Sequence, residues 1–84
     1  MITVTVRYFA GIRERLGTGA ETLRTDAATV GGLRDELIAR GGAHAEVLAR
    51  GRAVRAALDQ VMSDDAAALA DGAEVAFFPP VTGG

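Results

Sequence analysis

An alternating run stands near the start of this chain, Ile2-Thr3-Val4-Thr5-Val6-Arg7-Tyr8-Phe9. Because successive side chains of a strand point to opposite sides, the apolar positions of this run share one face and most polar positions share the other. β-Branched and aromatic residues, which are enriched in strands, dominate it. Residues 2–9 are therefore predicted to form a strand with one face against a core and the other toward water.

A second hydrophobic strand is predicted near the other end, at Glu74-Val75-Ala76-Phe77-Phe78. An Asp71-Gly72 turn signal precedes it. Pro79-Pro80 follows it and ends the pairing on that side, because proline has no backbone N–H to donate to a neighbouring strand. We expect this strand and the first one, the two most hydrophobic, to lie at the centre of a sheet.

A weaker strand is predicted at residues 21–25, after the turn residues Gly17-Thr18-Gly19. It should pair with residues 2–9 as a hairpin. Residues 10–16, which contain Arg13, Glu14 and Arg15, are interpreted as a short connection between the two.

The period then changes to that of a helix, with apolar residues at Val30, Leu33, Leu37 and Ile38. Thr29 is the predicted N-cap, and Gly41-Gly42 is the predicted end. Residues 43–50 are predicted to add a short helical turn with Val47 and Leu48 directed inward.

After Gly51, residues 53–62 alternate again and are predicted to form a third strand, whose polar positions Arg55, Asp59 and Ser63 face away from its apolar ones. An alanine-rich connection follows, and Leu69 is expected to fill part of the core. The order strand, strand, helix, strand, strand predicts an α+β domain, a mixed sheet of four to five strands covered by one main helix. That is the β-grasp topology, although other split α+β folds share the same periodicity.

Composition limits the function. The 84 residues allow one domain, predicted at residues 1–80, followed by a flexible, extended tail at 81–84. No cysteine and a single histidine exclude disulfides, a thiol nucleophile and a multi-ligand zinc site. The net charge of −2 argues against nucleic acid. Without a long apolar run or a leader-like N-terminus, we expect a cytoplasmic protein without membrane contact.

Candidate catalytic groups are few. His44 and Ser63 could in principle meet, but a solvated histidine and a strand-end serine are the simpler interpretation. Asp64-Asp65 could bind a metal, although adjacent acids in a loop more often serve as turn and cap residues. We therefore expect no metal site.

The closing residues, Pro79-Pro80-Val81-Thr82-Gly83-Gly84, carry the strongest functional signal. The prolines and β-branched residues favour an extended exit from the sheet. Glycines without a Cβ let the terminal carboxylate enter a narrow channel, and six residues reach roughly 20 Å. The prediction is that chemistry is done on Gly84 in another protein's active site. A simple frayed end is the alternative.

The sequence resembles the MoaD family, the small sulfur-carrying subunits of molybdopterin synthase with a ubiquitin-like β-grasp fold. Residues 71–84 differ from the family's closing DGDEVAFFPPVTGG only at Ala73, and residues 8–14 fit its FFA..RE pattern. The resemblance implies that Gly84, presented by Gly83, is adenylated by an E1-like adenylyltransferase that uses ATP. A sulfur donor protein then supplies the sulfur of a thiocarboxylate. The chain itself is expected to bind no cofactor.

The resemblance also implies a partner-binding surface. The larger catalytic subunit of molybdopterin synthase would bind the tail and use its sulfur to build the dithiolene of molybdopterin from a pyranopterin precursor. Apolar side chains on an exposed sheet face would dock both partners, with Phe78 and Met62 at the matching positions. The other residues implied in partner binding are Pro79, Pro80, Val81 and Thr82.

Other functions stay open. A sulfur carrier of the same fold could serve thiamine thiazole synthesis or transfer-RNA thiolation. A ubiquitin-like modifier would form isopeptides, although a chain without lysine cannot build side-chain-linked polymers of itself. A plain interaction module would use its tail only for docking.

Overall fold

The computed structural model describes residues 1–80 and contains strands and helices along most of that length. In chain order these elements are β1 (Ile2–Tyr8), α1 (Ala10–Leu16), β2 (Ala20–Thr25), α2 (Val30–Ile38), α3 (Gly42–Leu48), β3 (Arg55–Leu58), β4 (Val61–Ser63) and β5 (Glu74–Phe78).

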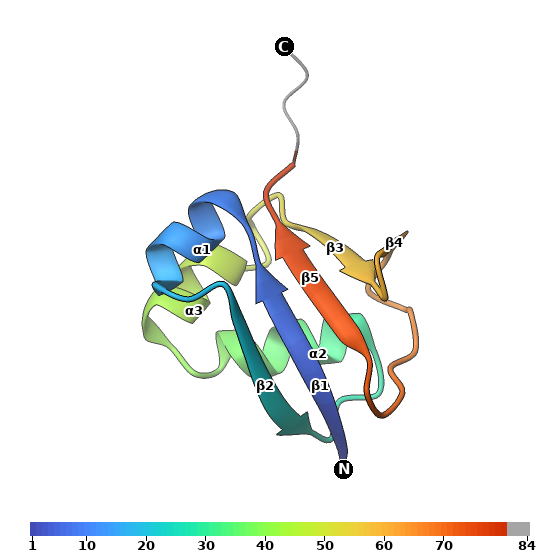
Figure 1. Ribbon diagram of the computed structural model, residues 1–84. Helices are drawn as coiled ribbons and strands as arrows, with labels where there is room; N and C mark the ends of the chain where they lie inside the picture. Colours follow the sequence, from blue (N-terminus) through green and yellow to red (C-terminus); the bar gives the residue numbers. More distant parts are fainter. Residues whose placement is uncertain (81–84) are drawn as a thin grey trace.

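The strands form one five-stranded sheet in the order β2-β1-β5-β3-β4. β1 and β5 are parallel, and the remaining neighbours are antiparallel. Helix α2 crosses behind one face of the sheet, α1 and α3 lie together beside one end of it, and the other face is open (Figure 1). This confirms a mixed sheet of the β-grasp type with the first and last strands in its interior.

The core lies between this sheet and the helices, as the alternation of β1 predicts. Val4, Val6 and Tyr8 of β1 are buried, while the intervening positions are more exposed. The side chains that complete the fully buried centre come from α2, α3 and β5: Val30, Leu33, Leu37, Leu48, Val75 and Phe77.

The interpretation of residues 10–16 as a connection is wrong, because they form the helix α1. Its single buried residue is Ile12, and Leu16 packs at the edge of the core. The helix ends at Gly17, whose φ of 75° is left-handed and whose N–H donates to the Arg13 carbonyl at 2.9 Å. Two large apolar side chains in seven residues give too little pattern to reveal a helix that tertiary contact stabilises.

Helix α2 begins as predicted, with the Thr29 hydroxyl accepting a hydrogen bond from the N–H of Gly32 at 3.1 Å. Its last helical residue is Ile38, and hydrogen bonds from the N–H of Arg40 to the Leu37 carbonyl at 3.1 Å and from the N–H of Gly41 to the Ile38 carbonyl at 3.0 Å form a tight turn that leads to Gly41. Gly41 and Gly42 adopt the predicted left-handed conformation, with φ values of 76° and 57°. The predicted helical turn at residues 43–50 is confirmed as α3, with Val47 and Leu48 buried.

The third strand predicted at residues 53–62 is in fact two strands, β3 and β4. They are joined by a tight turn at Asp59 and Gln60, which have φ values of 50° and 70°. The Asp59 carboxylate accepts a hydrogen bond from the N–H of Glu74 at 2.9 Å and so secures the turn to β5. Because the chain reverses at this turn, Met62 pairs with Ala57. It therefore lies on the same face of the sheet as Ala57, opposite to the face taken by Val54, Ala56 and Leu58.

Residues 64–73 connect β4 to β5 and pack against the start of α2, where the N–H groups of Val30 and Gly31 donate to the carbonyls of Ala67 and Asp65. Leu69 is half-buried and packs against the core, as expected. The predicted turn at Asp71-Gly72 is confirmed, with a left-handed φ of 86° at Gly72. Within the described part of the chain, no helix is long and apolar enough to cross a membrane.

Candidate functional site

The described part of the chain ends two residues after β5. Pro79 and Pro80 are half-buried and directly follow β5, at the end of the sheet where the parallel strand β1 also ends (Figure 1). The parallel pairing of β5 with β1 thus fixes the direction in which the chain leaves the sheet. Val81, Thr82, Gly83 and Gly84 lie outside the described residues.

Phe77 and Phe78 lie on opposite faces of β5. Phe77 is fully buried in the core, as its parity with Val75 predicts. Phe78 is half-exposed on the open face, beside Arg55 of β3. Phe9 extends β1 by one residue on the same side, since its N–H donates to the Phe77 carbonyl at 3.2 Å and its side chain is 44% exposed.

Met62 is placed on the same open face by strand register. It lies directly across from Ala57, which in turn lies across from Ala76 of β5. Half of the Met62 side chain is exposed, whereas the two alanines are largely covered. Together, Phe9, Ala57, Met62, Ala76 and Phe78 form an apolar surface that we call the open-face patch.

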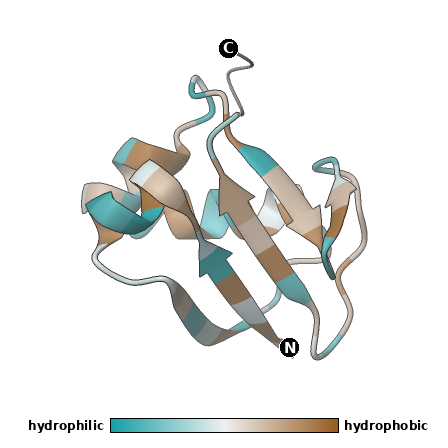
Figure 2. Ribbon diagram, turned by 45° about the horizontal axis from the view of Figure 1, so that its top comes forward, coloured by the Kyte–Doolittle hydropathy of each residue, from teal (hydrophilic) through white to brown (hydrophobic). Residues whose placement is uncertain are grey.

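Hydrophobic colours dominate β5 in the middle of the sheet, with a hydrophilic residue at its start (Figure 2). That residue, Glu74, forms an ion pair with Arg7 at 3.5 Å on the open face. Arg55 is exposed beside Phe78. An apolar centre with a charged rim is the usual anatomy of a protein interface.

His44 and Ser63 do not meet. His44 lies on α3 beside β1 and β2, with its Nε2 3.4 Å from a Glu21 carboxylate oxygen and its ring at the edge of Tyr8. Ser63 lies on β4 at the other end of the strand order. The structure therefore gives no support to a histidine-activated serine.

Glu21 is the centre of a polar cluster that the sequence did not reveal. The Tyr8 hydroxyl donates to Glu21 at 2.9 Å, and Arg40 donates to it at 2.7 Å. Burial and this hydrogen bond raise the pKa of Tyr8. Burial alone would raise the pKa of Glu21, but the hydrogen bonds from Arg40, Tyr8 and His44 outweigh it and lower that pKa. The cluster joins β2 to the α2–α3 connection.

Asp64 and Asp65 act as turn and pairing residues. The Asp64 carboxylate accepts a hydrogen bond from the N–H of Ala66 at 2.9 Å. Asp65 forms an ion pair with Arg50, which also pairs with Asp35 at 2.8 Å. Among residues 1–80, no three histidine, cysteine or acidic side chains gather as metal ligands would.

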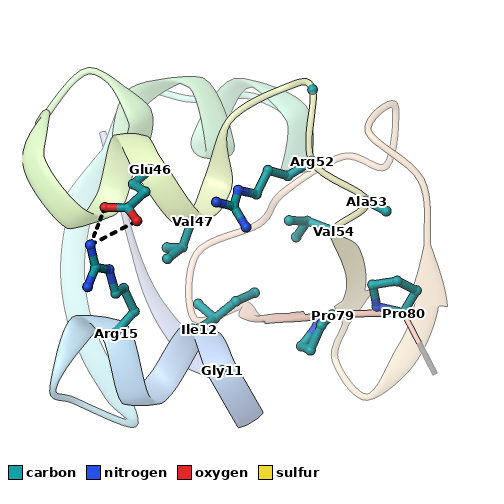
Figure 3. Close-up of a pocket in the computed structure, with 11 residues that line it drawn as sticks. Gly11, Ile12, Arg15, Glu46, Val47, Arg52, Ala53, Val54, Pro79 and Pro80 are labelled. Atoms are coloured by element: carbon teal, nitrogen blue, oxygen red, sulfur yellow. Dashed lines mark hydrogen bonds and ion pairs between the residues drawn. The ribbon is translucent and has the colours of Figure 1, made fainter. Parts of the chain in front are cut away.

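A groove of about 580 Å³ adjoins the start of the tail, and we call it the tail-base groove. Its walls include the apolar side chains of Ile12, Val47 and Val54, and its border includes Pro79 and Pro80 (Figure 3). At one end, Arg15 of α1 donates two hydrogen bonds to Glu46 of α3, at 2.7 and 2.8 Å. Sequence reasoning missed this groove, because its residues come from four separate segments.

A family model described as the ThiS family matches residues 6–84, nearly the whole chain. The chain belongs to the ThiS family. The molybdopterin synthase sulfur carrier subunit of Escherichia coli K12 is 42% identical over 81 residues, which cover 96% of this chain and 99% of that protein. The resemblance to the MoaD family is thereby confirmed.

Two solved structures extend the likeness to the fold of this ThiS-family chain. SAMP1 from Haloferax volcanii has a TM-score of 0.77 and 27% identity, covering 98% of this chain and 99% of that one. A chain in the complex of subunits 1 and 2 of the molybdopterin-converting factor from Helicobacter pylori has a TM-score of 0.70 and 26% identity, with coverage of 99% and 100%. The predicted ubiquitin-like β-grasp fold is confirmed.

Proposed function

We propose that this chain is the sulfur carrier subunit of a molybdopterin synthase and that Gly84 carries the sulfur as a thiocarboxylate. The observation that carries the proposal is the family match, which runs through to Gly84 itself. The E. coli relative that bears this function in its name matches along almost its full length. The fold adds a rigid base from which the tail can leave the sheet.

The proposed chemistry begins with a free carboxylate, which is a poor electrophile. One of its oxygens attacks the α-phosphorus of ATP on an E1-like adenylyltransferase, forming an acyl-adenylate and releasing pyrophosphate. Hydrosulfide delivered by a donor protein then attacks the acyl carbon with its sulfur. AMP leaves with the electron pair of the broken C–O bond, and loss of the thiol proton to solvent gives the thiocarboxylate. The carrier needs no cysteine for this, because the sulfur is held on its own terminus.

We assign partner docking to the open-face patch. An apolar surface with a charged rim, on a sheet face that no helix covers, is typical of an interface. The patch is continuous with the strand that leads into the tail, so a partner that covers Phe78 and Met62 also receives Pro79 and the residues after it. The larger synthase subunit and the activating enzyme are the proposed partners.

The sulfur chemistry is tested by the intact mass of the protein purified from its own cells. A fraction heavier by one oxygen-to-sulfur exchange is expected, and it should vanish when Gly84 is deleted. The proposal fails if only the unmodified mass appears after incubation with the activating enzyme, ATP and a sulfur donor.

Docking is tested by placing a charge on the patch. Met62→Asp should weaken binding to the larger subunit at least tenfold, since a carboxylate would be desolvated at the centre of an apolar contact. Val61→Asp is the matched control, because Val61 is the neighbouring residue, is 67% exposed, and pairs with Leu58 on the other face. Equal affinity for both variants would place the interface elsewhere.

A ubiquitin-like modifier is the second candidate, and the likeness to the small archaeal modifier protein SAMP1 favours it. Both functions need an activated Gly84, but they differ in the acceptor. Isopeptides between Gly84 and lysines of other proteins would indicate a modifier. Sulfur delivered to a pyranopterin would indicate the synthase subunit, and delivery to thiazole or transfer RNA would indicate one of the other sulfur carriers.

A further inference from the structure

A second cavity, of about 530 Å³, is lined by residues of α2, of the outer strands β3 and β4, and of β5, and we call it the edge cavity. Its apolar lining includes Val54, Ala56 and Phe77. Ala56 pairs with Phe77, which is fully buried in the core, so this lining lies on the helix side of the sheet. No residue of the open-face patch lines the edge cavity.

The edge cavity contains a buried cation that no carboxylate neutralises. Arg34 lines the cavity and is only 7% exposed. Its Nε and Nη2 atoms donate to three backbone carbonyls at 2.7 to 3.3 Å. Within residues 1–80, however, Arg34 forms no ion pair, and its Nη1 atom forms no hydrogen bond. Because buried charges in proteins are usually paired, this guanidinium has one positive charge and two N–H donors left for an anion.

A second unsatisfied group lines the same cavity. Among the buried and half-buried residues of the described chain, Ser63 Oγ is the only side-chain nitrogen or oxygen atom that is closed off from solvent and has no hydrogen-bond partner. Ser63 pairs with Ala56, so its side chain lies on the helix side of the sheet, opposite to the side predicted from a single strand. Rotation about χ1 of Ser63 would turn this hydroxyl toward an anion in the cavity.

The charges at the border of the cavity favour a ligand with a single negative charge. Arg55, Asp64 and Asp65 are exposed there. Asp65 forms an ion pair with Arg50, and the charges of Arg55 and Asp64 are opposite. The border therefore has no net charge, and Arg34 remains the uncompensated group. A second negative charge on the ligand would be repelled by Asp64.

We propose that the edge cavity binds a monocarboxylate with a small apolar body, its carboxylate on Arg34 and Ser63 and its body against Ala56 and Phe77. A guanidinium and a hydroxyl are suitable donors for the two oxygens of a carboxylate, and the apolar lining covers the hydrocarbon part. A free acid and the end of a peptide present this same chemistry. Such a ligand leaves the open-face patch uncovered, so its binding is compatible with docking of a partner there.

The test follows the amide signals of Ala56, Ser63 and Ala66 in ¹⁵N NMR spectra while sodium 3-methylbutanoate is added to the isolated protein at constant sodium concentration. We expect saturable shifts with a dissociation constant of about 1 mM. The uncharged analogue 3-methylbutan-1-ol and inorganic phosphate should each bind roughly tenfold more weakly or worse. N-Acetyl-leucine presents the carboxylate of a peptide end. Tighter binding of N-acetyl-leucine than of 3-methylbutanoate would assign the site to peptide ends, and weaker binding would assign it to free acids.

Ser63→Ala separates a role in binding from a role in the fold. Removal of a hydroxyl that has no partner should leave the stability of the free protein unchanged or raise it. It should weaken binding of 3-methylbutanoate about tenfold, because a hydrogen bond to a charged acceptor is lost. Thr3→Ala is the matched control, since it removes an exposed hydroxyl on β1, away from the cavity.

Three results would each overturn the proposal. They are equal affinity of wild type and Ser63→Ala, equal binding of the alcohol or of phosphate, and shifts that do not saturate. No partner protein, nucleotide or sulfur is used, so the result is independent of the proposed carrier function.

Discussion

Arg34 offers the sharpest test of how this fold is held together, because it is a buried cation whose hydrogen bonds connect two helices and a loop. It lies on α2 with 7% exposure. Its guanidinium donates to the carbonyls of Leu48 at 2.7 Å, Ala49 at 2.7 Å and Arg52 at 3.3 Å. These carbonyls end α3 and begin the segment that leads to β3. Burial, followed by repulsion from Arg50, lowers the pKa of Arg34.

The size of the effect follows from these contacts. Each hydrogen bond from a charged donor contributes about 1.5–3 kcal/mol, but desolvation of the guanidinium offsets part of the sum. Arg34→Met fills similar space and leaves the buried Leu48 carbonyl without its partner, which by itself costs about 1–3 kcal/mol. We expect a net loss of about 2–4 kcal/mol from a total stability of about 4–13 kcal/mol.

Urea unfolding followed by circular dichroism measures this loss. The urea midpoint should fall by about 1–4 M, and Tm by at least about 8 °C. Arg34→Lys should lose less than Arg34→Met, since an ammonium keeps the charge and can serve some of the carbonyls but lacks the planar fork. Arg24→Met, on an exposed position, should change stability by less than about 0.5 kcal/mol. A loss below that value for Arg34→Met would refute the reasoning.

Three further changes test the faces and contacts of the fold. Phe77→Ala should lower the free energy of unfolding by about 3–5 kcal/mol, because Phe77 is fully buried. Phe78→Ala, on the open face, should lower it much less and should instead weaken binding of the larger subunit. Equal stability losses would contradict the assignment of the two residues to opposite faces. Gly31→Ala should destabilise the fold by about 1–2 kcal/mol despite the better helix propensity of alanine. The reason is that the new Cβ would lie 2.8 Å from the Cβ of Asp65. A gain in Tm would show that the segment containing Asp65 can move to make room. Folding lowers the pKa of Glu21, so this carboxylate contributes stability that is complete above its ordinary pKa of 4.5 and is lost as pH falls through the lower folded value. In Glu21→Gln, urea unfolding at successive pH values should show a smaller loss of stability toward acid. An unchanged pH profile would contradict the role of the cluster.

The proposed functional end of the molecule can be predicted from the sequence, because the prediction depends on the chemistry of single residues and not on packing. Two prolines favour an extended exit from the sheet, and glycines at positions 83 and 84 have no Cβ to block the approach of another protein to the carboxylate. The docking residues are a different case. Phe78 could be placed on the open face from its parity with Phe77, but Met62 reached that face only through the turn at Asp59-Gln60 and its pairing with Ala57.

The sequence by itself determined the elements whose pattern is long and regular. β1 alternates over seven residues and α2 repeats its apolar positions over two turns, so each segment must bury one face. Capping by Thr29 and the breaks at Gly72 and Pro79 are equally local, because they rest on the conformations that single residues favour.

Only the tertiary structure decided the remainder. Helix α1 carries only two large apolar side chains and is stabilised because Ile12 packs in the core. The turn that separates β3 from β4 is held by two hydrogen bonds between Asp59 and Glu74, which are 15 residues apart. The tail-base groove and the carbonyls held by Arg34 likewise depend on segments that are distant in sequence. Such features arise from contacts formed after the chain is compact, and no local periodicity encodes them.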